Sequence, residues 1–344
     1  MQRLGGTLLF LLALAFAQFA NPPAPGAPAP PLPAPAMPPG GPGGGLLPLP
    51  TPAKRYPLPE WIRPGVAFLY QDMSGRITQA YLVTDLAPDG AYGLVLTLVQ
   101  SPGSPPMYQL EALPLVQNGA GFFYLHPEAV ADAVREAQAN PTPGLKVVGG
   151  SGWFAVESQG PAGTTQYAFR YDPETGLVQE AAVSERYPKG TQAVSYRYLG
   201  YQTFDWQSPA EFPPAAHEPH AYELATAVAG FGNPLGLLEI QPLQLTRPLA
   251  LFQLTANLGG YPQSDRAGGL TALGPHYLHP ELIRRGTVFA LPKLGVGYTV
   301  QGDTATLTWG SGPLAVVRLQ PESGLVLERR ETLPLGQMIL RLVR

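Results

Sequence analysis

The feature that most constrains the fold of this chain is a pair of short segments, each of which occurs twice. Residues 124–128, Tyr-Leu-His-Pro-Glu, recur at 277–281, and residues 171–178, Tyr-Asp-Pro-Glu-Thr-Gly-Leu-Val, return at 319–326 as Leu-Gln-Pro-Glu-Ser-Gly-Leu-Val. The order is the same in both copies, and the glutamates of the two segments lie 46 residues apart in the first copy and 41 in the second. Two matches in register predict an internal repeat.

The eight-residue segment has the pattern of a turn between two strands. Proline presets the φ angle of the first central position of a turn, and glycine can take the left-handed conformation that closes it. Apolar and aromatic residues typical of strands stand on both sides. We therefore expect structural roles for Pro173, Gly176, Pro321 and Gly324.

The five-residue segment has the pattern of a helix start. Proline suits the first helical position, and glutamate favours the positive end of the helix dipole. The sequence predicts helices over 127–138 and 280–285, the second stopped by Gly286. Strand patterns dominate elsewhere, and 66–70, 77–86 and 92–99 read as an antiparallel meander. The predicted fold is mainly β (α+β), with two repeats of twisted antiparallel sheet that each carry one short helix.

Composition divides the chain into five parts. Residues 1–17 resemble a signal peptide, because Arg3 precedes an apolar run and Ala15 and Ala17 are small residues at a cleavage site; an uncleaved anchor is the alternative. Residues 18–55 are a spacer rich in Pro, Ala and Gly, either a tether or a solvated tail. We expect repeat 1 at 56–206, a linker at 207–229 and repeat 2 at 230–344.

These features predict an exported protein of the periplasm or cell envelope with no transmembrane span after signal cleavage. The chain has no cysteine, which excludes N-terminal lipid attachment, thiol catalysis and iron–sulfur clusters. Its net charge is −3 without a basic run, which disfavours nucleic-acid binding. Neither a phosphate-binding loop nor a nucleophile elbow is present, and we expect no cofactor.

Three groups of residues are candidates for chemistry. Asp172 and Glu174 could form an acid–base pair, but Gln320 replaces the aspartate in the second copy, which favours a turn role. His276 and His279 could ligate a metal, or could instead cap and pack at a helix start. Five aromatic residues at period two could form a stacking platform for a flat ligand or fill a core: Tyr167, Phe169, Tyr171, Tyr196 and Tyr198.

The strand, the Asp-Pro-x-Thr-Gly-Leu turn and the strand that follows it, over residues 171–178, resemble a hairpin of LolA-type periplasmic lipoprotein carriers and related half-barrel sheets. The resemblance implies a curved antiparallel sheet, covered by helices, that encloses an apolar cavity for acyl chains. It covers a small part of the chain and transfers no binding residue.

The sequence thus favours binding or scaffolding in the cell envelope over catalysis. The expected partners are a lipid, a glycan or another envelope protein. Two further hypotheses stay open: a periplasmic carrier of lipid or another hydrophobic ligand, and a metal-dependent hydrolase built around His276 and His279.

Overall fold

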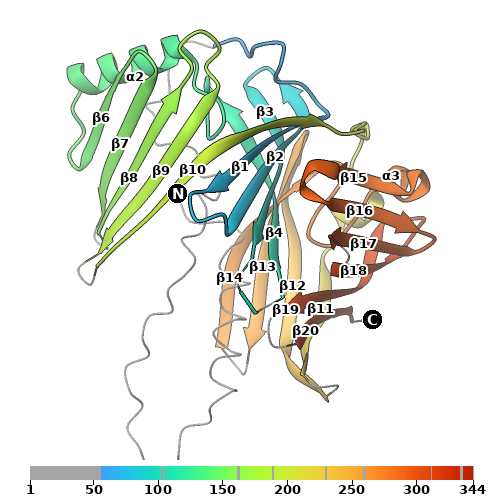
Figure 1. The fold of residues 1–344 in the computed structure, drawn as a ribbon. Helices are drawn as coiled ribbons and strands as arrows, with labels where there is room; N and C mark the ends of the chain where they lie inside the picture. The colour runs from blue at the N-terminus through green and yellow to red at the C-terminus, as the bar shows by residue number, and fades with distance from the viewer. Residues whose placement is uncertain are drawn as a thin grey trace, which may run out of the picture.

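The computed structural model describes residues 56–343, except 101, 104, 161–162, 188–189, 229–230, 259–260, 311 and 334–335. The expected signal peptide, 1–17, and the whole of the expected spacer, 18–55, lie outside the described residues. The described residues form two ten-stranded antiparallel sheets with two α-helices (Figure 1). The predicted fold class is therefore confirmed.

Sheet 1 has the strand order β5-β4-β3-β2-β1-β10-β9-β8-β7-β6. Its first and last long strands, β1 and β10, pair at the centre, so that two meanders spread outward from them. The strands are β1 (Val66–Asp72), β2 (Ile77–Ala87), β3 (Gly90–Val99), β4 (Met107–Gln117), β5 (Ala120–Gly121), β6 (Leu145–Gly150), β7 (Trp153–Gly160), β8 (Gly163–Tyr171), β9 (Val178–Tyr187) and β10 (Gly190–Thr203).

Sheet 2 repeats this plan in the order β14-β13-β12-β11-β20-β19-β18-β17-β16-β15. Here β11 and β20 are the central pair. The strands are β11 (His220–Val228), β12 (Phe231–Thr246), β13 (Leu249–Leu258), β14 (Tyr261–Leu270), β15 (Thr287–Leu291), β16 (Val296–Gln301), β17 (Thr304–Trp309), β18 (Gly312–Gln320), β19 (Leu325–Leu333) and β20 (Gly336–Leu342).

In each repeat the helix-start segment hydrogen-bonds to the turn segment. The amide of Leu125 donates to the carbonyl of Gly176 at 2.9 Å, and that of Leu278 donates to Gly324 at 2.9 Å. Both glycines have φ +76°, and a side chain on either would overlap the backbone of the facing leucine. The repeated sequence therefore marks one docking contact, made twice, with Pro173 and Pro321 in the two equivalent turns.

The two helices begin where the sequence predicts. Helix α2 (Pro127–Ala139) and helix α3 (Pro280–Arg285) both start at the proline of the five-residue segment. The preceding histidine caps each helix: Nδ1 of His126 accepts from the amide of Glu128 at 3.2 Å, and Nδ1 of His279 accepts from Glu281 at 3.1 Å. Gly286 ends α3 in the left-handed conformation, as expected.

The segment between the repeats is more ordered than its Pro- and Ala-rich composition indicated. A 3₁₀ turn, η1 (Pro214–His217), buries Ala215 and Ala216, and β11 begins at His220. The segment expected as a linker, 207–229, therefore contains the first strand of sheet 2. Residues 222–227 pair with β12 on one side and with β20 on the other, so this strand lies at the centre of sheet 2. A high Pro and Ala content does not predict such a strand.

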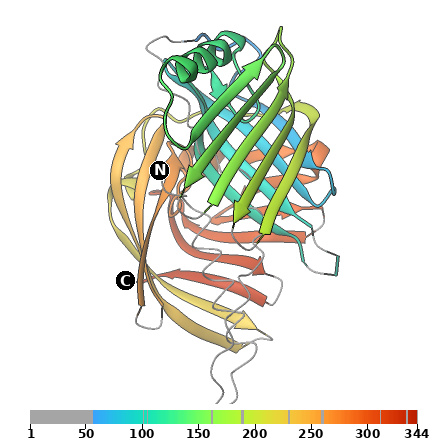
Figure 2. The ribbon, with the colours of Figure 1, turned by 90° about the vertical axis from the view of Figure 1, so that its left-hand side faces the viewer.

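The first meander of sheet 1, β1 to β4, packs on both faces. One face, with Phe68, Tyr70 and Tyr81, joins the core under α2; the other, with Leu69 and Leu82, joins the core of sheet 2. Figure 2 shows the second sheet beside this meander, away from the α2 side. Because both faces are buried, these strands are continuously apolar. The two repeats thus share one core.

Candidate functional site

A hollow in the described structure lies between the two sheets. It has a volume of about 720 Å³ and is partly open to solvent. Sheet 1 contributes β3 and β4, and sheet 2 contributes strands from both of its meanders. In Figure 1, β4 descends beside β13 and β14, and the red strands of sheet 2 face it. The size falls within the range of about 300–1,000 Å³ typical of small-molecule sites.

Most of the wall of this inter-sheet cavity is apolar. Leu224 and Met338 line it, and although both are buried, they form a small cluster separate from the main core of sheet 2. Buried side chains normally interlock with a single core. These two instead pack with the partly buried Leu235, Leu258, Leu333 and Leu340. Other apolar lining residues are Leu94, Leu110, Ala112, Leu238, Ile240, Leu254, Leu307, Val317 and Leu340.

Among the polar side chains that line this wall, three are joined to one another. Arg329 and Glu331 of β19 form an ion pair, and Tyr108 of β4 bonds to both. The Tyr108 hydroxyl donates to Oε1 of Glu331 at 2.7 Å and accepts from a guanidinium nitrogen of Arg329 at 2.9 Å. We call Tyr108, Arg329 and Glu331 the polar trio. It joins the two sheets across the cavity.

Electrostatic interactions within the wall keep Arg329 charged and Tyr108 neutral. Burial opposes the charge of Arg329, but Glu331 and Tyr108 outweigh it and hold the pKa of the guanidinium above its ordinary value. Burial also raises the pKa of the Tyr108 hydroxyl, so it stays protonated. Arg329 keeps 28% of its side chain exposed whereas Glu331 keeps 4%, and both line the cavity.

A neighbouring carboxyl on the same wall is also perturbed. Glu111 of β4 lines the cavity and accepts a hydrogen bond from the amide of Gln109. Burial, followed by the facing charge of Asp265 on β14, raises the pKa of Glu111 to about 7; the Gln109 hydrogen bond acts in the opposite direction.

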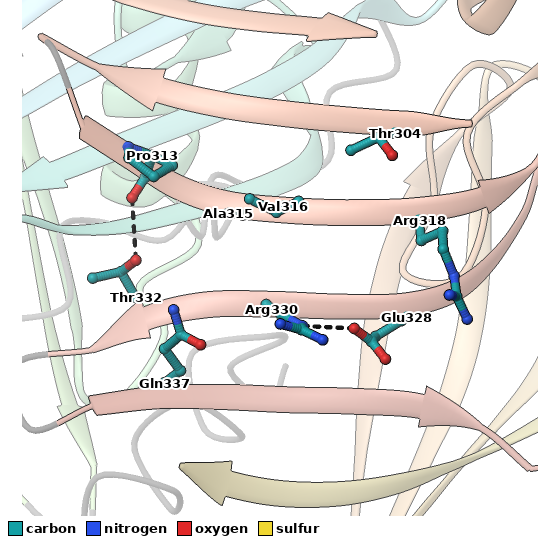
Figure 3. Close-up of a pocket in the computed structure, with 9 residues that line it drawn as sticks. All are labelled: Thr304, Pro313, Ala315, Val316, Arg318, Glu328, Arg330, Thr332 and Gln337. Atoms are coloured by element: carbon teal, nitrogen blue, oxygen red, sulfur yellow. Dashed lines mark hydrogen bonds and ion pairs between the residues drawn. The ribbon is translucent and has the colours of Figure 1, made fainter. Parts of the chain in front are cut away.

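A second, smaller hollow of about 360 Å³ lies on the outer face of sheet 2 (Figure 3). Its one carboxylate already has partners: Glu328 accepts from Nε of Arg330 at 2.6 Å and from Nε of Arg341 at 2.8 Å. Burial alone would raise the pKa of Glu328, but these arginines hold it below its usual value. The threonine hydroxyl of Thr332 donates to the carbonyl of Pro313 at 3.1 Å. We therefore place the candidate site in the inter-sheet cavity.

The five aromatic candidates lie in the core of sheet 1, away from this cavity. Phe169, Tyr171 and Tyr196 are buried, and Tyr167 and Tyr198 pack against the same cluster. Phe122 fills the space between them, with its ring 5.8 Å from that of Tyr196 and 6.2 Å from that of Phe169. The structure therefore supports the core-filling alternative over an exposed stacking platform.

The two candidate metal ligands have separate structural roles. His276 is fully buried, and its Nε2 bonds to the carbonyl of Ala215 at 2.9 Å, whereas His279 caps α3. Within the described ranges, no three His, Asp or Glu side chains gather closely enough to hold a metal ion. Burial lowers the pKa of His276 to about 4, which matches a packed neutral ring. The capping-and-packing alternative accounts for both residues.

The polar trio was missed at the level of sequence, although one signal was present. Residues 328–331 read Glu-Arg-Arg-Glu within a strand pattern. Because successive side chains of a strand point to opposite faces, such a run must place charges on the inner face as well. Arg329 and Glu331 are those inner residues. Tyr108, more than two hundred residues away, carried no comparable signal.

Comparisons with known proteins leave the family of this chain open. No protein-family model matches the sequence, and no curated protein matches it. Among solved structures, a protein of unknown function from the DUF3598 family of Nostoc punctiforme aligns over 82% of this chain and 96% of its own, with 10% identity and a TM-score of 0.17.

None of the helices in the described part of the chain is long and apolar enough to cross a membrane.

Proposed function

We propose that this chain is an exported binding protein that holds a hydrophobic small molecule in the inter-sheet cavity. Among the hypotheses raised by the sequence, this develops the carrier of lipid or another hydrophobic ligand. Export follows from the signal-like residues 1–17.

The observation that carries the proposal is an apolar cavity of about 720 Å³ inside a fold that is otherwise closely packed. Because the cavity is partly open to solvent, its apolar wall is in contact with water and lacks the dispersion contacts of a packed core. An apolar ligand restores those contacts and removes the wall from water. The cavity lies between the two sheets, whereas the LolA resemblance implied one between sheet and helix.

The other hypotheses have less support. A scaffold needs no cavity, and the carboxylate of Glu328 in the outer hollow of sheet 2 is already paired with two arginines. A hydrolase centred on His276 and His279 would need both rings at one open site, but one is buried against Ala215 and the other caps α3.

Binding of the uncharged fluorescent dye Nile red to the delipidated full chain tests the proposal. We expect saturable binding of one dye per chain, with a blue-shifted emission that reports an apolar site. Replacing Val317, which lines the cavity, by Trp should fill part of it and weaken dye binding at least ten-fold.

The neighbouring residue provides the matched control. Val316 lies on the opposite face of the same strand and lines the outer hollow. Val316→Trp should bind the dye within two-fold of the wild type, with both variants checked for folding by near-ultraviolet circular dichroism. A folded Val317→Trp protein that binds as well as the wild type, or a wild type that binds no dye, would refute the proposal.

A further inference from the structure

The polar trio narrows the chemistry of the ligand. The trio lies on the cavity wall among apolar neighbours: in the sheet register Arg329 stands between Val317 and Leu340, and Glu331 stands between Ala315 and Met338. A charged pair among apolar neighbours is costly unless its hydrogen bonds are satisfied. It is also the point at which a ligand's polar group would be recognised.

Unused hydrogen-bonding capacity remains at this point. Nε of Arg329 has no hydrogen-bond partner among the described residues but is itself buried, so a ligand reaches Arg329 through the 28% of its side chain that is exposed. Tyr298 also lines the cavity, near enough to Arg329 and Glu331 for both charges to act on its hydroxyl. A ligand group that accepts and donates hydrogen bonds therefore finds partners here.

The charges of the trio are already balanced. Arg329 carries one positive charge and Glu331 one negative charge, in direct contact. A ligand carboxylate would place two anions on one guanidinium, and a ligand ammonium would compete with that guanidinium for one carboxylate. Either would leave an excess charge within the apolar wall, which opposes binding.

Building on the proposed function, we infer that the ligand is an uncharged amphiphile: an apolar chain that ends in a hydroxyl, ester or amide group. The polar end lies at the trio, and the chain lies along the apolar wall formed by residues such as Leu238 and Leu254. Charged amphiphiles of the same chain length are rejected.

Competition between three ligands of equal chain length tests this inference. Nile red bound to the full chain is displaced with dodecan-1-ol, dodecanoate or dodecylammonium, each below its micelle concentration. Dodecan-1-ol should displace the dye at a concentration at least ten-fold lower than either charged ligand. Equal or better displacement by dodecanoate or dodecylammonium overturns the inference but leaves the proposed function standing, whereas absence of dye binding overturns both.

Charge variants of the trio give an independent measurement. Glu331→Gln leaves Arg329 uncompensated and should shift preference toward dodecanoate at least ten-fold; Arg329→Gln should shift it toward dodecylammonium. The double variant restores neutrality and should again prefer dodecan-1-ol. Unchanged preferences in folded variants contradict the inference. If the single variants fail to fold, the wild-type ranking alone decides.

Discussion

The imidazole of His276 illustrates how a residue with ligand chemistry becomes part of a core. It lies against the rings of His220, Phe252 and Tyr277, and bonds to the carbonyl of Ala215 in η1. That contact connects the inter-repeat segment to the interior of sheet 2. A sequence shows the spacing of histidines but does not show which carbonyl accepts a hydrogen bond from the ring. Metal ligation and packing at a helix start were therefore both compatible with the sequence.

Burial of His276 makes folding stability depend on pH. Its pKa is lowered to about 4 in the folded protein, against 6.5 for the ordinary group. Between these values the unfolded chain binds the proton and the folded one does not, so this residue's contribution to stability is lost as pH falls from 6.5 toward 4. At about 1.4 kcal/mol per pKa unit, the loss has an upper limit of about 3 kcal/mol.

The variant His276→Gln isolates this effect, because glutamine keeps a donor for Ala215 and does not titrate. Urea unfolding from pH 7 to pH 4 should show the wild type losing stability relative to the variant. Glu111, with its raised pKa, acts in the opposite direction in both proteins and cancels in the difference. Parallel stability curves would show that His276 is not the source.

At the scale of elements, local signals in the sequence were sufficient to predict where the helices and turns lie. The prolines at 127 and 280 start both helices, and Gly286 stops the second. Strand pairing was not predictable in the same way, because the central pairs join the first and last strands of each repeat. Nothing local to β1 or β10 encodes that partnership.

Repeat 2 also departs from the plan in two elements. Within sheet 1, five strands precede α2, including the two-residue β5, and five follow it; within sheet 2, four precede α3 and six follow it. The turn segment lies between β8 and β9 in one copy and between β18 and β19 in the other. The shared contact is thus preserved while an additional strand extends the outer meander of sheet 2.

The docked turn predicts a specific stability difference between two glycines. Gly324 and Gly302 both have positive φ, but only Gly324 faces backbone, that of Leu278, where a methyl group would overlap. Gly302→Ala should cost about 1 kcal/mol of unfolding free energy, from conformation alone. Gly324→Ala should cost a further 1–3 kcal/mol, roughly, because the turn must move away from the helix start. Equal losses in urea unfolding would argue against the docking contact as a stabilising feature.

At the scale of the whole molecule, the two repeats pack against each other through a shared hydrophobic core. The meander β1 to β4 is buried on both faces, and β4 lies so close to β14 that a side chain on Gly268 would overlap the carbonyl of Ala112. Continuous apolar runs in this meander, such as residues 80–83, are typical of strands buried on both faces. In β10, by contrast, buried and exposed residues alternate because one face is solvated. The cavity itself arises from the spacing of two sheets, which no local pattern specifies.

The proposed function requires that the cavity between the sheets accept an apolar ligand. Crystals of the full chain with 12-bromododecan-1-ol allow the bromine to be located by its anomalous scattering. We predict one bromine site between β4 and sheet 2, beside apolar lining residues such as Leu238 and Leu254, in wild-type protein. Bromine found only on the outer surface, with the inter-sheet cavity filled by ordered water, would contradict the account.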